Sequence, residues 1–106
     1  MKRGDLVTVA VSGDYGKPRP ALVVQADAFD RHPSVIVLPL TSEIHDAPLF
    51  RVLVAAGELS GLRVPSQIMV DKATAVPRVK MGQRIGRVDH ATLEAVDQAL
   101  RGFLGL

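Results

Sequence analysis

The chain has 106 residues, of which 47% are apolar, so it suits one domain with a modest core and not a disordered chain. It contains no cysteine, which excludes disulfides, thiolate metal sites and a cysteine nucleophile. The net charge is only +2, but residues 71–87 carry five basic side chains and one acidic one. That run indicates an anionic partner such as RNA, DNA or an acidic peptide, and a solvated basic face explains it equally well.

Short apolar runs alternate with turn residues through most of the chain, which predicts a small, strongly bent antiparallel sheet or partial barrel. The third run, residues 34–40, is continuously apolar, so we expect a strand buried on both faces, with Pro39 at its end or at a bulge. The other expected strands cover residues 5–11, 19–25, 49–54 and 66–70, with two short ones at 73–76 and 84–88.

The last part of the chain changes to a helical period. Apolar residues at helical spacing predict one terminal helix with a single apolar stripe on the sheet: Leu93, Val96, Leu100, Phe103 and Leu104. Asp89 is a suitable N-cap, and Gly105 a suitable C-terminal stop. We therefore expect residues 1–106 to form a single domain with no linker. Since no apolar run approaches the ~20 residues that span a bilayer and no signal peptide is evident, we expect a soluble, cytoplasmic protein.

The stretch "GKPRPALVV" places Arg19 between two prolines at the start of a strand. Pro18 and Pro20 each fix their own φ, and Pro20 biases Arg19 toward extended backbone. Such an arginine loses little further entropy when it presents its fork to a fixed anionic target, such as a phosphoryl group in a transition state. An arginine paired with a carboxylate at a strand start is the simpler alternative.

The stretch "PLTSE" places two hydroxyls, Thr41 and Ser42, where the buried strand emerges. A strand end fixes position while the loop gives access, so this is a second candidate site. An ST-turn or a helix cap explains the same residues.

The common enzyme motifs are absent from the sequence. His32, His45 and His90 have no metal-binding spacing, so no metal site is expected. The chain also lacks a GxSxG elbow, a GxxxxGK[ST] loop and a GxGxxG loop.

Five stretches in order, "RGDLVTV", "RPALVVQAD", "VLPLTSE", "SQIMVDK" and "RIGRVD" before a terminal helix, resemble the MazF/PemK family of toxin endoribonucleases. The resemblance runs from Arg3 to the C-terminus, so residues 1–106 are expected to be a single MazF/PemK-like toxin domain. It implies a mainly β (α+β) fold, a compact SH3-like antiparallel β-barrel with a C-terminal α-helix, as in CcdB and PemK. It also implies a homodimer, metal-independent and sequence-specific cleavage of single-stranded RNA without a cofactor, and an antitoxin with an acidic, partly disordered tail.

The resemblance assigns catalysis to Arg19 and Thr41, positions that the residues had already singled out. Attack by the RNA 2′-OH would give a 2′,3′-cyclic phosphate and a 5′-OH. Arginine stays protonated, so Arg19 is expected to donate and not to accept a proton. Asp71 is one choice of general base, and direct loss of the proton to water is another. The expected RNA contacts are Tyr15, Lys17, Ser42, Gln67, Asp71 and Lys72.

Some features depart from the family pattern. The loop at 12–18 is shorter than in many relatives, and Ile68 and Met69 follow Gln67 where relatives carry an arginine. One cationic RNA contact is therefore missing unless Lys72 replaces it. Two alternatives to a ribonuclease are a CcdB-like gyrase poison, which depends on a C-terminal tryptophan absent here, and an inactive SH3-like binding module.

Overall fold

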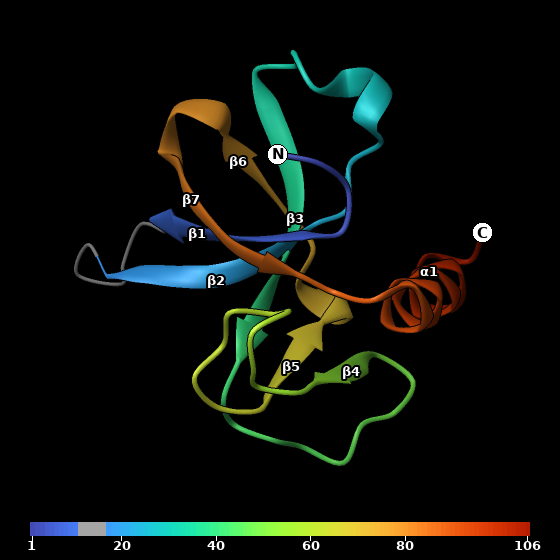
Figure 1. Ribbon diagram of the computed structural model, residues 1–106. Coiled ribbons are helices and arrows are strands. Elements are labelled where there is room, and N and C mark those ends of the chain that lie inside the picture. The colour runs from blue at the N-terminus through green and yellow to red at the C-terminus, as the bar shows by residue number, and fades with distance from the viewer. Residues whose placement is uncertain (11–16) are drawn as a thin grey trace.

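The computed structural model describes residues 1–10 and 17–106 as one bent antiparallel sheet with a C-terminal helix (Figure 1). The strands are β1 (Asp5–Ala10), β2 (Pro18–Val23), β3 (Ser34–Thr41), β4 (Arg51–Val54), β5 (Ser66–Met69), β6 (Thr74–Pro77) and β7 (Met81–Arg87). The helix α1 covers His90–Leu104, and three short 3₁₀ turns are η1 (Asp27–Phe29), η2 (Val70–Lys72) and η3 (Arg78–Lys80).

The strand order is β4-β5-β3-β2-β1-β7, and β6 pairs with the first half of β3. The predicted mainly β class with a terminal helix is confirmed, although the sheet is open because no pairing joins β4 to β7 among the described residues. No helix in this described part of the chain is long and apolar enough to cross a membrane.

Side chains alternate between the two faces along each strand, and at the centre of the sheet a separate apolar cluster covers each face. One face carries Leu6, Leu22 and Leu38, which pack with residues of β5, the loops and the helix. The other face carries a smaller cluster of mainly valine and alanine, closed by the curl of the sheet and β6. The two-sided burial predicted for residues 34–40 is right at its centre and wrong at Ile36, whose side chain is exposed.

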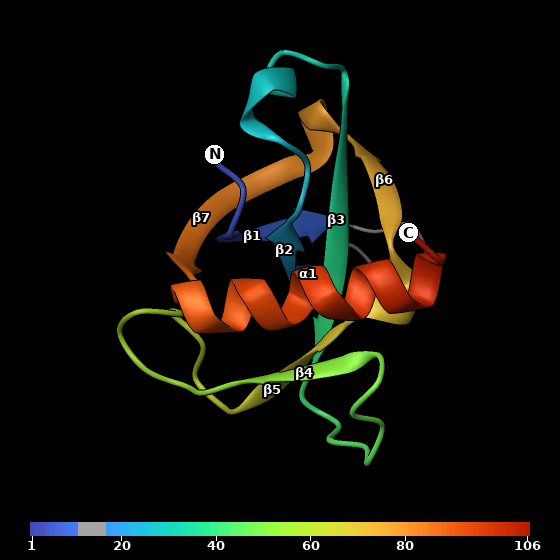
Figure 2. The same cartoon turned by 90° about the vertical axis from the view of Figure 1, so that its right-hand side faces the viewer.

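The helix α1 lies across the sheet beside β4 (Figure 2). Its predicted caps are confirmed: Asp89 accepts a 2.8 Å hydrogen bond from the Thr92 backbone N–H, and Gly105 adopts φ 72°. The hydrogen bonds from Thr92 hold the pKa of the Asp89 carboxyl below its usual range. Leu93, Val96 and Leu100 pack on the core as expected.

The C-terminal end of the predicted apolar stripe is not covered. Phe103 is 51% exposed and Leu104 is 56% exposed. The Phe103 ring lies near the ring of Phe50, with their centroids 6.2 Å apart. The last turn of the helix therefore leaves part of its apolar face exposed.

Two ion pairs join segments that are distant in the sequence. The Arg3 guanidinium on the N-terminal segment bonds Asp97 on α1, and Arg84 on β7 bonds Asp5 on β1. Burial raises the pKa of the Asp5 carboxyl, but the Lys2 backbone N–H and Arg84 together outweigh burial and leave that pKa below its usual range. The Arg84–Asp5 pair therefore contributes to the fold at neutral pH.

Candidate active site

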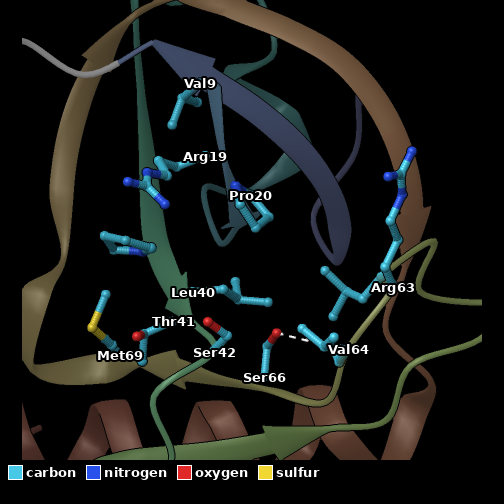
Figure 3. A pocket seen from close by; sticks show the side chains of 12 residues that line it. Val9, Arg19, Pro20, Leu40, Thr41, Ser42, Arg63, Val64, Ser66 and Met69 are labelled. Carbon is cyan, nitrogen blue, oxygen red and sulfur yellow. Dashed lines mark hydrogen bonds between the residues drawn. The ribbon is translucent and has the colours of Figure 1, made fainter. Parts of the chain in front are cut away.

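A hollow of about 560 Å³ opens between the start of β2, the end of β3 and the loop that precedes β5. Most of its wall is apolar, and its polar side chains are few (Figure 3). Pockets of this size and character are the usual place for small ligands and reacting groups. Its lining residues are Val9, Arg19, Pro20, Pro39, Leu40, Thr41, Ser42, Leu62, Arg63, Val64, Ser66 and Met69.

Strand register brings Arg19 and Thr41 to this hollow. The pairing of β2 with β3 ends at Ala21 opposite Pro39. Arg19 and Thr41 each lie two residues beyond that last pair, so they share one face of the sheet at the point where the strands separate. The ladder ends at the point where each strand carries a proline, Pro20 in β2 and Pro39 in β3, and a proline has no backbone N–H to donate.

Arg19 stands on the β2 wall of the hollow, across from the hydroxyls at the end of β3 (Figure 3). Its backbone is held by pairing with Val9 on β1, and the flanking prolines pair with Thr8 and Ala10. The proline-flanked segment around Arg19 is therefore part of a paired strand and not a loop. It presents an exposed cationic side chain beside an apolar wall.

The Thr41 hydroxyl is held in place by its own turn. Its Oγ1 accepts a 3.1 Å hydrogen bond from the Glu43 backbone N–H. This is the ST-turn that the sequence offered as the alternative to a site, and the two are compatible. A hydroxyl that accepts one bond still has its own O–H to donate. The turn therefore orients Thr41 and leaves a donor for a ligand in the hollow.

The pattern that defines the PemK-like, MazF-like toxin of type II toxin-antitoxin systems matches residues 2–104. The chain belongs to this family. It is 44% identical over 107 residues to a protein named probable endoribonuclease MazF from Mycolicibacterium smegmatis, covering 100% of this chain and 98% of the relative. Endoribonuclease EndoA of Bacillus subtilis is 28% identical over 111 residues, covering 100% and 96%.

Solved structures of toxins have the same fold. An endoribonuclease in complex with its cognate antitoxin, from a mycobacterial species, superposes with a TM-score of 0.82 at 25% identity, over 100% of this chain and 96% of that one. The Mycobacterium tuberculosis toxin MazF-mt6 gives a TM-score of 0.83 at 23% identity, over 96% and 97%. The fold expected from the MazF/PemK resemblance is confirmed.

Among the other predicted site residues that the structure describes in this PemK/MazF-family chain, only Ser42 lines the hollow. Gln67 is buried, and its amide makes two hydrogen bonds with the His45 backbone, donating at 2.8 Å and accepting at 3.0 Å. It thereby holds the loop after Thr41. Lys17 is exposed just before β2 and does not line the hollow. Tyr15 lies outside the described residues.

Asp71 and Lys72 lie in η2, directly after β5, and do not line the hollow. The Asp71 carboxylate accepts from the Arg51 Nε at 3.1 Å, and both side chains are largely buried. The Lys72 Nζ stands 4.0 Å from the same carboxylate. The Arg51–Asp71 ion pair joins β4 to η2 and so has a structural role.

Arg63 lines the hollow and was not predicted as a site residue. Its loop, residues 55–65, has no motif and lies between strands, so no local pattern singles it out. The available signal was a lone arginine between Gly61 and Pro65, two residues that fix backbone. No group of three or more metal-ligating side chains gathers anywhere in residues 1–10 and 17–106.

Proposed function

We propose that this chain is the toxin of a type II toxin–antitoxin system and a metal-independent, sequence-specific endoribonuclease acting on single-stranded RNA. The observation that carries the proposal is the placement of Arg19 and Thr41 on facing walls of one hollow. Family membership and the names of the M. smegmatis and B. subtilis relatives support RNA as the substrate.

RNA carries its own nucleophile, so the protein needs to supply only position and charge stabilisation. The 2′-oxygen forms a bond to the adjacent phosphorus while the bond from phosphorus to the 5′-oxygen breaks. The products are a 2′,3′-cyclic phosphate and a 5′-OH, whose oxygen takes a proton from water. Arg19 donates two N–H bonds to the phosphoryl oxygens, and Thr41 donates its O–H to the same group.

The proton on the 2′-OH leaves to water in this scheme. Asp71 is the alternative base suggested by the sequence, but its carboxylate is bonded by Arg51 and does not line the hollow. Arg19 serves as the positive charge that a bound cation would otherwise supply, which is why we expect the reaction to proceed without one.

Cleavage of a long single-stranded RNA by the purified protein in EDTA tests this proposal. We expect cuts at defined sites, 5′-OH ends that a kinase labels without prior dephosphorylation, and no increase on adding Mg²⁺. Absence of cleavage by folded protein freed of antitoxin would contradict the ribonuclease, and inhibition of gyrase would then be measured for the CcdB-like alternative.

The same proposal includes a homodimer formed through β4 and α1. A groove of about 730 Å³ runs between these elements, and its rim exposes Leu49, Leu53 and Phe103. Among the described residues that line it, Arg51 is the only charged one, and its guanidinium is paired with Asp71. A second copy of this mainly apolar face matches it in an isologous interface. An acidic antitoxin tail instead matches the cationic hollow around Arg19 and Arg63.

Light scattering after gel filtration tests the dimer. We expect a dimer at micromolar concentration and a monomer for Leu53→Asp, because a carboxylate placed in the apolar interface would lose its water. Val79→Asp is the matched control, since Val79 is 92% exposed on η3, outside the groove. A wild-type monomer, or equal behaviour of the two variants, would contradict the β4–α1 dimer.

A further inference from the structure

The cationic hollow has a second arginine, opposite the first. Arg63 lies on the far side from Arg19, and Figure 3 shows its side chain extending along β7, away from Thr41. Arg63 is exposed, and within the described chain its side chain makes no hydrogen bond or ion pair. Two cations at opposite sides of one opening suit two groups of an extended polyanion.

The loop that carries Arg63 is rigid on its N-terminal side. Leu62 is buried in the core, and the Gly57 backbone N–H donates to its carbonyl at 3.1 Å. The Ser60 hydroxyl donates to the Ala55 carbonyl at 2.8 Å and accepts from the Leu62 N–H at 3.2 Å. These bonds close the turn directly before Arg63.

The C-terminal side of the loop is fixed in the same way. Pro65 restricts its own backbone, and the buried Ser66 donates its hydroxyl to the Val64 carbonyl at 3.1 Å. The loop also rests on β7, where the Arg87 N–H donates to the Leu59 carbonyl at 2.9 Å. Arg63 therefore projects from a fixed base, which limits the entropy lost when it binds an anion.

The wall between the two arginines is apolar. Pro20, Leu40 and Val64 line the hollow between Arg19 and Arg63 (Figure 3). An apolar wall offers no partner for phosphate but accepts the face of a nucleobase or the carbons of a ribose. Across the hollow, a cation is followed by an apolar wall and then by a second cation. This order matches a phosphate, a nucleoside and the next phosphate along a single strand.

We propose that Arg63 binds an RNA phosphate other than the one that is cleaved, and so fixes the course of the strand through the site. This inference rests on the proposed ribonuclease function. Arg63 is a binding residue and takes no part in the chemical step. Its contact is equal in the bound substrate and in the transition state, so it lowers KM and leaves kcat unchanged.

The test compares Arg63→Ala with Arg31→Ala, which removes the same charge from an exposed position before β3, at the opposite end of that strand from Thr41. Affinity is measured by anisotropy on a fully 2′-O-methylated single strand, which cannot be cleaved at any position. We expect Arg63→Ala to weaken binding about tenfold at about 50 mM salt. The slope of log K against log salt should fall in magnitude by about 0.7, with Arg31→Ala near wild type.

Kinetics on ordinary RNA complete the test. We expect Arg63→Ala to raise KM about tenfold with kcat within about twofold of wild type, and Arg63→Lys to recover most of the affinity because a point charge still binds phosphate. Equal affinity and salt slope for Arg63→Ala and Arg31→Ala would overturn the role of Arg63 while wild-type cleavage stood. A wild-type protein that binds RNA through Arg63 but never cuts it would overturn the ribonuclease alone.

Discussion

Arg19→Ala is expected to lower kcat/KM for RNA cleavage about a thousandfold or more, with most of the loss in kcat. The fork of Arg19 donates to charge that develops on the phosphoryl oxygens as the 2′-oxygen attacks, so its bonds strengthen in the transition state. A single-turnover assay with excess protein measures this loss without interference from product release. Arg31→Ala is the control, because it removes one exposed arginine away from the hollow.

Variants of Thr41 test what its hydroxyl contributes at the same phosphoryl group. Thr41→Val keeps the shape and removes the hydroxyl, and should cost about tenfold to a hundredfold in kcat, while Thr41→Ser should retain most activity. The double variant Arg19→Ala/Thr41→Val should cost less than the product of the single effects, because both donors serve one group. Multiplicative losses, or full activity of Arg19→Ala, would contradict the shared site.

The strands and the helix that the sequence predicted well are those with strong local patterns. The central strand β3 and the helix α1 have long apolar runs and clear caps, and their boundaries agree closely with prediction. The strand β7 begins at Met81, three residues before the predicted start, because Gly82 and Gln83 are exposed and show no strand pattern. The strand β4 begins at Arg51 and not at 49, because Leu49 is 82% exposed in the preceding loop.

The two catalytic candidates were within reach of the sequence because each has a local signature. Arg19 is bracketed by prolines, and Thr41 follows an apolar run. Gln67 was assigned to RNA binding from the family resemblance, whereas in the fold its amide bonds the backbone of His45, 22 positions away. Such side-chain to backbone contacts between distant segments leave no local pattern.

Arg63 could not be predicted as a site residue from the sequence for a related reason. Its position depends on the close approach of two segments that are far apart in the chain, where Gly61 lies against Ile85 and Gly86 lies against Leu59 and Ser60. Gly61 has φ +73° and lies against the Ile85 carbonyl, where a Cβ would come within 1.9 Å of the oxygen. Neither glycine indicates by itself which segment it approaches, so only the folded chain places Arg63 across the hollow from Arg19.

Gly86→Ala is therefore expected to have the second largest effect, this time on stability. A Cβ at this position would lie 2.3 Å from the Ser60 carbonyl carbon and oxygen and 2.5 Å from the Leu59 oxygen. These are backbone atoms of a closed turn and cannot rotate away, so the loop or β7 must shift. We expect the free energy of unfolding to fall by about 3 kcal/mol, measured in urea, and Tm to fall by about 10–20 °C.

The same shift should move Arg63, which joins the stability of the fold to the binding of RNA. In protein that remains folded at low temperature, Gly86→Ala should weaken RNA binding several-fold, and it should add little in an Arg63→Ala background because the contact is already gone. Gln83→Ala, at an exposed position on the same strand, is the control and should leave stability and affinity near wild type. If Gly86→Ala were as stable as Gln83→Ala, the loop would not be held by this approach, and the fixed base inferred for Arg63 would lose its main support.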